Sequence, residues 1–411
     1  MSQTGKFIVV LTAAFLTLAG CRQQQPIIPK LLPLPSKLNL PEDHWTTTAD
    51  NWSLHLRHYP PAAIDPDRMP VILCHGLSHN NNYWDLAESV SLAKYLQVEG
   101  FDVWAVSLRG TGQSTKPTLS NIKQLFRLEV SVFNPKGVVN RQPGLLKLNW
   151  TVDDHIQRDI PAAIDYVMKK TGKPQVFWIG HSMGSMIMFA YLATIDQSKV
   201  KGFIALAAPM HLVRPSNDIY ELMATNADFV KIGNLTTGTN YRAIVGVLAG
   251  PFVNTPIDQL FLNESNVDPE LLRVFYYANQ EDISPGQLDQ LLQYLKTGSF
   301  SSYDGKTNYT NTAHKITVPV LQVLGQLDNM ISPGDAAAFH QTLGSKDKQF
   351  RVFGRINGYR ADYGHDDIVI GKYARDEVFP YLRDWLIAQS RPPGKSLLPF
   401  LTTRPVKGKK Q

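Results

Sequence analysis

Three residues have the types and the chain order that nucleophilic catalysis needs: Ser182, Asp328 and His365. A serine hydroxyl is a weak nucleophile until a neutral histidine accepts its proton, and an acid must hold that histidine in the right tautomer. Each of the three follows an apolar run of strand type, and a parallel sheet would bring such strand ends to one edge. The sequence therefore predicts acyl-transfer chemistry with these residues as nucleophile, acid and base.

Ser182 lies in the turn Gly180-His181-Ser182-Met183-Gly184. An apolar strand-like run, 175–179, precedes the turn, and an apolar helix-like run, 185–192, follows it. This is the context of a nucleophile elbow, in which the two glycines let neighbouring backbone approach closely. The pattern predicts that the serine oxygen stands at the end of the sheet, near the positive end of the helix.

The acid has two candidates in the sequence. Asp328 follows Gly325 at the end of a predicted buried strand, 318–325, whereas Asp218 follows the preceding predicted strand. Some lipases place the acid after the preceding strand, so Asp218 remains a rival. We favour Asp328 because it follows its strand directly.

The other histidines are weaker candidates for the base. His181 lies inside the elbow, where we expect its ring to point away from the site. His155 and His340 fall on predicted helices, where we expect ordinary solvent or packing roles. His365 is therefore our predicted base.

Two acidic residues, Asp366 and Asp367, directly follow His365. We interpret them as residues at a helix N-terminus, where the helix dipole favours negative charge. The run 365–367 lacks spaced partners of the H-E-x-x-H kind, so we expect no metal there. We expect no organic cofactor either.

The tetrahedral intermediate of acyl transfer also needs hydrogen-bond donors for its oxyanion. The backbone N–H of Met183, directly after the nucleophile, is one predicted donor. The backbone N–H of Leu77 is the other, because His75-Gly76-Leu77 ends a predicted buried strand. The same His-Gly pair is also compatible with an ordinary turn at the end of a strand.

Strand-like runs alternate with helical stretches, which predicts an α/β fold with a mostly parallel, twisted sheet flanked by helices. We place its core at 45–210 and 313–390. A mainly helical insertion, 211–312, interrupts the alternation and is predicted to cap the active edge. The insertion has more apolar residues than one core-facing stripe needs: Leu271, Leu272, Phe275, Tyr276 and Tyr277. We expect them to form the wall of an acyl-binding pocket, the alternative being that they pack against each other.

The first twenty residues, 1–20, resemble an export signal, with Lys6 before an apolar stretch. Leu18-Ala19-Gly20-Cys21 resembles a bacterial lipobox, which predicts that Cys21 is lipidated and anchors the chain to a membrane. A plain secretory signal is the alternative. By its resemblance to lipoproteins that lack Asp after the lipidated cysteine, Arg22 indicates the outer membrane rather than the inner one. Residues 21–44 are a proline-rich tether, and 391–411 are a loose tail whose lysines are either solvated or at a membrane surface.

The composition excludes several classes of protein. The 411 residues are 43% hydrophobic and 18% charged, which is typical of a globular protein. The net charge of +6 is too small and too dispersed to indicate a nucleic-acid partner. The second of the two cysteines, Cys74, has no partner if Cys21 is lipidated, so we expect no disulfide. Cys74 lies in the apolar run 71–74 and is predicted to be a buried hydrophobe.

With these motifs in place, the chain resembles the acid lipases, the gastric and lysosomal type of α/β-hydrolase. The matching pieces, in chain order, are 75–77 with 83–84, 100–104 with 109–110, 159–167 with 171–172, 180–184, 303–305 with 308–309, 318–320 with Asp328, and 362–367 with 371–372. They span most of residues 70–385. The resemblance implies the α/β-hydrolase fold and the same catalytic residues.

The chain departs from that family in three ways. Met183 stands where these lipases usually have Gln, the insertion is shorter, and the family's cap disulfide has no cysteines here. The family's preference for neutral lipids and acid pH therefore does not carry over. Our interpretation is a lipid-anchored hydrolase of carboxylic esters, with acyl lipids among the candidate substrates. The alternatives are an acyltransferase that uses the same residues, and a non-catalytic binding scaffold.

Overall fold

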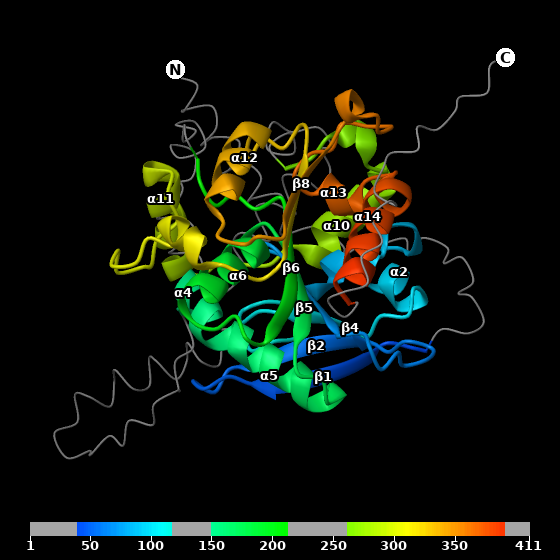
Figure 1. Ribbon diagram of the computed structural model, residues 1–411, viewed down its shortest axis with the longest axis horizontal. Helices are drawn as coiled ribbons and strands as arrows, with labels where there is room; N and C mark the ends of the chain where they lie inside the picture. The colour runs from blue at the N-terminus through cyan, green and yellow to red at the C-terminus, as the bar shows by residue number, and fades with distance from the viewer. Residues whose placement is uncertain (1–38, 117–148, 213–260, 391–411) are drawn as a thin grey trace, which may run out of the picture. The chain divides into compact units, whose positions relative to one another are not determined.

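An eight-stranded sheet organises the described part of the chain, which the computed structural model gives for residues 39–116, 149–212 and 261–390 (Figure 1). The strand order is β1-β2-β4-β3-β5-β6-β7-β8. β1 and β2 pair antiparallel with their neighbours, and the remaining pairs are parallel. The strands are β1 (Glu42–Thr47), β2 (Ser53–Tyr59), β3 (Val71–Cys74), β4 (Val103–Ser107), β5 (Val176–His181), β6 (Val200–Leu206), β7 (Val320–Gly325) and β8 (Lys348–Phe353). The predicted mostly parallel α/β sheet is confirmed.

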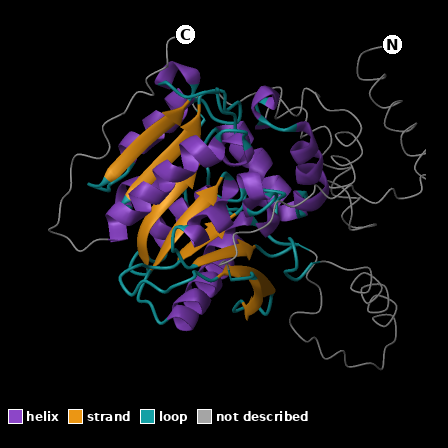
Figure 2. Ribbon diagram, turned by 90° about the vertical axis from the view of Figure 1, so that its right-hand side faces the viewer, coloured by secondary structure: helices purple, strands orange, loops and turns teal. Residues whose placement is uncertain are grey.

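Helices cover both faces of the sheet, as Figure 2 shows with strands in orange between purple helices. One face carries α4, α5, α6, α11 and α12, and the other carries α2, α10, α13 and α14 (Figure 1). The helices are α2 (Leu92–Val98), α4 (Val152–Asp154), α5 (Ile160–Thr171), α6 (Met183–Thr194), α10 (Pro269–Asn279), α11 (Pro285–Thr297), α12 (Pro333–Thr342), α13 (Asp367–Ile370) and α14 (Ala374–Ser390). Within the described residues, no helix is long and apolar enough to cross a bilayer.

The pleat of the strands divides the apolar residues between two cores. In β3, Ile72 and Cys74 belong to one cluster, and Val71 and Leu73 belong to the other. Successive side chains of a strand point to opposite faces, so a strand that is apolar throughout must be covered on both sides. This is why β3 reads as an unbroken apolar run.

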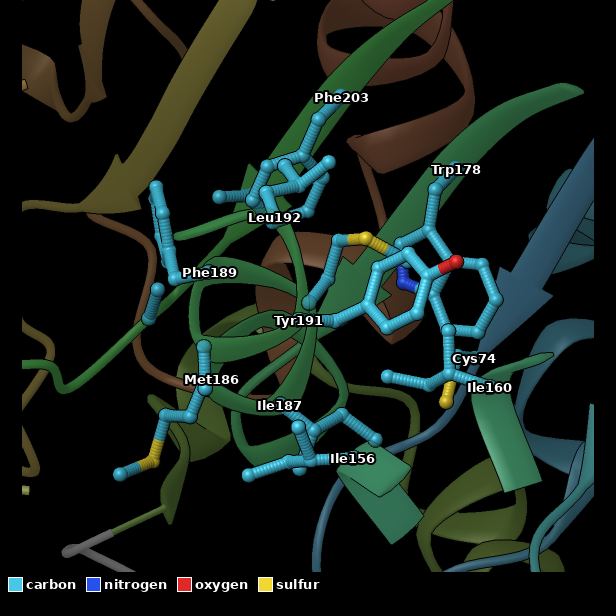
Figure 3. Packing of buried hydrophobic residues seen from close by; sticks show 14 of the residues in the cluster. Cys74, Ile156, Ile160, Trp178, Met186, Ile187, Phe189, Tyr191, Leu192 and Phe203 are labelled. Carbon is cyan, nitrogen blue, oxygen red and sulfur yellow. The ribbon is translucent and has the colours of Figure 1, made fainter. Parts of the chain in front are cut away.

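Helix α6 follows Ser182 and is buried along nearly its whole length, from Met183 to Ala193. A helix that is apolar all round belongs in a core, and this one packs between the sheet and the helices of its face. Figure 3 shows its residue Tyr191 beside Trp178 of β5, with Phe189 and Leu192 on the side of Phe203 of β6. The predicted buried, inert role of Cys74 is confirmed: the side chain is fully buried, and burial raises the pKa of its thiol.

The N-terminal boundary of the core differs from the prediction. β1 begins at Glu42, inside the segment 21–44 that we assigned to the tether. Its register pairs Glu42 with His58 and Thr47 with Ser53. The prolines end at Pro41, so the chain is free to form a ladder from the next residue. The segments 1–38 and 391–411, which include Cys21, lie outside the described residues.

The structure describes two α-helices of the predicted insertion, α10 and α11. α11 begins with a capping box, in which the Ser284 hydroxyl accepts from the Gln287 N–H at 3.1 Å. In α10, the side chains of Leu271, Leu272, Phe275 and Tyr276 are buried in the core cluster, and Tyr277 is 61% exposed.

The prediction that these α10 residues are spare surface for an acyl pocket is therefore wrong for the four buried side chains. They pack against the neighbouring 3-10 turn, Asn81–Trp84, and against the core behind it. Residues 213–260 of the insertion lie outside the described residues, so its limits stay a prediction.

Candidate active site

The turn between β5 and α6 holds Ser182 in an unusual backbone conformation, with φ 50° and ψ −118°. Such angles cost a residue with a Cβ on the order of 1–3 kcal/mol and persist only where the surroundings enforce them. Here the Ser182 N–H donates to the Leu206 carbonyl at 2.9 Å, and the Ser182 carbonyl accepts from Met186 at 3.0 Å. Ser182 is half-buried between fully buried neighbours. The strained turn thus brings its hydroxyl to the accessible edge of the sheet.

The two glycines of the elbow are required by close backbone contacts. A Cβ on Gly184 would collide with the carbonyls of Cys74 and His75 at the end of β3. A Cβ on Gly180 would collide with the carbonyl of Gly184. The prediction that these glycines allow close approach is confirmed, and it explains how the elbow lies directly against the β3 loop.

Asp328 and His365 meet at the same edge of the sheet. Both oxygens of the Asp328 carboxylate lie near Nδ1 of His365, at 2.9 and 3.1 Å. The backbone N–H groups of Met330 and Ile331 donate to Asp328 at 2.9 and 3.1 Å, which fixes the carboxylate. The structure therefore places the favoured acid beside the predicted base. The rival acid, Asp218, lies outside the described residues.

The surroundings of His365 favour its charged form. Burial opposes protonation, but the charge and hydrogen bond of Asp328, with the nearby Asp366 and Asp367, raise the pKa of the His365 ring. A histidine in this state can hold a proton taken from a neighbouring hydroxyl. Among the described residues, no hydrogen bond joins the Ser182 hydroxyl to the His365 ring, so the structure brings two of the three predicted residues into contact.

His181 connects the serine turn to the histidine loop. Its Nε2 donates to the His365 carbonyl at 2.9 Å, and its ring lies 4.9 Å from the His365 ring in an edge-on arrangement. The prediction that the His181 ring points away from the site is therefore wrong. Because a carbonyl can only accept, His181 is the Nε2–H tautomer. Burial lowers the pKa of His181 well below its usual value, so the ring stays neutral.

The predicted oxyanion donors lie on the loop after β3 and at the start of α6. A Cβ on Gly76 would stand 3.1 Å from the Cβ of Ser182, so the His75-Gly76-Leu77 loop directly adjoins Ser182. His75 holds this loop, because its Nε2 accepts from Leu108 N–H at 3.1 Å and its Nδ1 then donates to the Gly76 carbonyl at 2.8 Å. Burial lowers the pKa of His75 to about 4, which keeps it neutral. That the N–H groups of Leu77 and Met183 face one oxyanion stays a prediction.

Asp366 and Asp367 do stand at the N-terminus of α13, but they are fully buried. Burial raises the pKa of Asp366 to about 7 and that of Asp367 to about 6. Asp367 accepts from Asn266 Nδ2 at 2.7 Å and from the Gly364 N–H at 2.8 Å. It therefore holds the His365 loop against the inserted segment, a role that dipole arguments on sequence did not reveal.

The other two histidines that we weighed as the base, His155 and His340, have packing roles, as expected. His155 is buried and pairs with Asp159 at 2.7 Å, and Asp159 in turn binds the guanidinium of Arg109 at 2.7 Å. His340 is buried beside Gln322. Neither ring contacts Ser182, Asp328 or His365 in the described residues.

The fold and the edge geometry define an α/β-hydrolase. Residues 69–356 match the α/β hydrolase fold family, and because this is most of the chain, the protein belongs to that family. The resemblance to acid lipases is supported by relatives over most of their length. A tear acid lipase-like protein of Mesocricetus auratus is 24% identical over 371 residues, covering 81% of this chain and 84% of the relative. Triacylglycerol lipase 2 of Arabidopsis thaliana is 23% identical over 383 residues, covering 82% of each.

A solved structure agrees on the fold. A thermophilic esterase from Thermogutta terrifontis superposes with a TM-score of 0.54 at 17% identity, covering 85% of this chain and 100% of the esterase. At that identity the likeness concerns the fold alone. The named relatives are lipases, and together with the family they support a carboxylic ester hydrolase.

Asp328 should control the protonation of His365, and replacing it with Asn tests this. In Asp328→Asn, burial is no longer opposed by the adjacent charge, so the pKa of His365 should fall below its present raised value. NMR titration of the histidine ring protons measures the change. His340, which pairs with Gln322 and has a pKa lowered to about 4 by burial, is the internal control. A His365 titration that is identical in both proteins would contradict the assignment.

Proposed function

We propose that this protein hydrolyses carboxylic esters through an acyl-enzyme intermediate on Ser182. The observation that carries the proposal is the Asp328–His365 pair, held at 2.9 Å at the edge of the sheet where the strained serine turn emerges. His181, next to Ser182, packs against the His365 ring and ties the two parts together. Membership of the α/β-hydrolase family supports the same assignment.

The reaction would proceed in two symmetrical halves. Asp328 accepts the hydrogen bond of His365 Nδ1–H, which leaves Nε2 as the proton acceptor. Ser182 Oγ attacks the ester carbonyl carbon while its proton passes to Nε2, and the oxyanion is held by the backbone N–H groups of Leu77 and Met183. The C–O bond then breaks, and His365 returns the proton to the departing alcohol. Water repeats these steps on the acyl-enzyme and releases the acid.

The acyl chain has a candidate binding surface on α11. Ile283 and Leu288 are buried, and they pack with the partly buried Leu77 and Leu292 into one small apolar cluster. Leu77 is also the proposed oxyanion donor, so apolar surface lies next to the reacting carbonyl. This location replaces α10, whose apolar residues are used by the core. Apolar surface beside the reacting carbonyl supports substrates that are esters with an acyl chain longer than acetate.

Two other functions are compatible with the same site. An acyltransferase would form the same acyl-enzyme and pass the acyl group to an alcohol rather than to water. A binding scaffold without catalysis would keep the fold but would have no need for a charge-paired histidine beside a strained serine. Product analysis with and without an added alcohol acceptor separates the first alternative, and loss of all turnover would favour the second.

The proposed site of action is a membrane surface. Cys21, outside the described residues, would carry the lipid that anchors the chain, and Arg22 favours the outer membrane. Membrane fractionation of a Cys21→Ala variant tests the anchor. Release of the variant supports it, whereas normal processing with unchanged membrane binding would place the anchor elsewhere.

Labelling and substitution test the catalytic residues. A fluorophosphonate probe should label Ser182 and fail to label Ser182→Ala. Asp328→Asn should lower kcat by about 10⁴, because the histidine loses its tautomer and charge partner. Asp218→Asn is the matched control and should stay near the parent activity. The reverse ranking of the two Asn variants would move the acid to Asp218.

Chain-length selectivity tests the α11 surface. With p-nitrophenyl esters of increasing acyl length, kcat/KM should rise beyond acetate by up to about 0.8 kcal/mol per methylene until the surface is covered. Leu292→Gln should flatten this rise. Tyr277→Gln, on the exposed side of α10, should leave it unchanged. Equal turnover of acetate and octanoate esters by the parent protein would identify a hydrolase of small esters instead.

A further inference from the structure

A second cluster of chemically active side chains lies on β1 and β2, away from the serine. It consists of Glu42, His44 and His58, which we call the edge cluster. Glu42 and His44 are two residues apart on β1, so they point to the same face of the strand. The register places His58 of β2 directly opposite Glu42. The antiparallel ladder therefore gathers all three side chains on one face of the sheet.

The distances within the edge cluster suit a small cation. His44 Nε2 lies 3.3 Å and His58 Nδ1 lies 3.7 Å from the same Glu42 oxygen. One ligand atom from each residue falls within 4.8 Å of the others. A tetrahedral zinc ion with ligands at about 2.0–2.2 Å separates them by roughly 3.3–3.6 Å. The two imidazole centroids are 5.6 Å apart and inclined by 64°, so both rings can direct a nitrogen to one point.

The outer nitrogens of both rings already have partners. His58 Nε2 binds the Asp102 carboxylate at 2.6 Å, so it carries the proton and leaves Nδ1 as a free lone pair. His44 Nδ1 binds the Tyr166 hydroxyl at 3.0 Å, and Nε2 is hydrogen-bonded to the Glu42 carboxylate at 3.3 Å, a bond that an ion between the two groups would replace. A carboxylate or hydroxyl on the outer nitrogen is the usual support of a metal-bound histidine.

A buried nitrogen without a hydrogen-bond partner and the packing of the two imidazole rings also support an ion site. The Nδ1 atom of His58 is shielded from solvent and has no hydrogen-bond partner among the described residues. The His58 ring stacks on the Trp104 indole at 3.8 Å, and the His44 ring lies 5.0 Å from the same indole. Both imidazoles are thus oriented by packing before any ion binds. An unpaired buried nitrogen is costly, and an ion would satisfy it.

We propose that the edge cluster binds one divalent transition-metal ion of the zinc type, through Glu42, His44 Nε2 and His58 Nδ1. The pocket around it holds about 250 Å³ and opens to solvent, so water can complete the coordination. Pocket residues Pro70, Asp102 and Lys173 precede β3, β4 and β5, which places the ion at the N-terminal ends of these strands. The site is thus at the opposite end of the strands from the loops that carry Ser182 and His365. The ion holds β1 against β2 and takes no part in ester cleavage.

The cations that line this pocket do not compete for the ion's ligands. Arg68 pairs with Asp65 at 3.1 Å, and the Lys173 ammonium binds the Pro66 carbonyl. Lys170 lies over the Tyr166 ring. The carboxylates of Glu42 and Asp102 supply negative charge on the side that the ion would occupy.

A second group, His79, His181 and Asp366, also gathers three ligand types within 4.8 Å. It is fully enclosed, and His181 already donates its Nε2–H to the His365 carbonyl. An ion there would have to enter a closed interior and compete with that bond. The edge cluster is the accessible one, and variants of the enclosed group serve as the matched control.

The test uses the full-length chain without a polyhistidine tag, stripped with a chelator and titrated with Zn²⁺ by calorimetry. We expect one Zn²⁺ per chain, a rise in the melting temperature, and tetrahedral absorption bands when Co²⁺ replaces Zn²⁺. All three signals should be lost in the double variant His44→Gln with His58→Gln. Asp102→Asn, which removes only the outer partner of His58, should weaken Zn²⁺ binding by about 10–100-fold.

Two controls make the outcome decisive. His314→Gln, an exposed histidine outside both groups, should bind Zn²⁺ like the parent. Ester hydrolysis by the edge variants should be unchanged, which also verifies that they fold. Undiminished Zn²⁺ binding in the double variant, or binding lost in His79→Gln instead, would overturn the proposal. So would a parent chain that binds no Zn²⁺.

Discussion

The candidate site depends on backbone segments that approach one another too closely for a side chain. Gly184 lies against the carbonyls of Cys74 and His75, and a Cβ there would force α6 away from the end of β3. Gly325 lies equally close to the carbonyl of Tyr363, where the end of β7 meets the loop that carries His365. The positions of Ser182, of the loop after β3 and of His365 are therefore set by main-chain packing. These contacts involve only backbone atoms and glycines, so they do not depend on the side chains of Ser182, Asp328 or His365.

A layer of buried polar groups beneath this frame decides the charge state of the site. Burial keeps His75 and His181 neutral, so each can donate one fixed hydrogen bond, to the carbonyls of Gly76 and His365. His365 differs because it has a carboxylate partner, and the pKa of its ring is raised. Histidines with the same intrinsic chemistry thus divide into neutral groups that hold backbone carbonyls and one ring, His365, with a raised pKa. The presence or absence of an adjacent charge makes the difference.

The ends of the strands could be predicted from the sequence, but the contacts of the side chains packed behind those ends could not. Apolar runs that end in Gly or a polar residue mark where a parallel strand stops, so Ser182, Asp328 and His365 could be assigned to one edge. The contact between His181 and His365, and the burial of Asp366, depend on neighbours far away in the chain, and no local pattern encodes them. The α10 helix shows the same limit, because core and pocket linings have the same composition. The prediction missed the start of β1 because pairing with β2, rather than the residues of β1 themselves, decides where the strand begins.

The two ends of the sheet divide the proposed work of the protein. The turns and loops that follow the C-terminal ends of the parallel strands carry Ser182, Asp328 and His365. The edge cluster lies at the other end, on strands β1 and β2, whose ladder fixes Glu42 opposite His58. An ion at that end would stabilise the outermost antiparallel pair, the part of the sheet with a neighbour on one side only. Because no residue belongs to both sites, loss of metal binding and loss of catalysis are independent observations. The proposal of a metal site can therefore be wrong while the proposal of ester hydrolysis is right, and the reverse also holds.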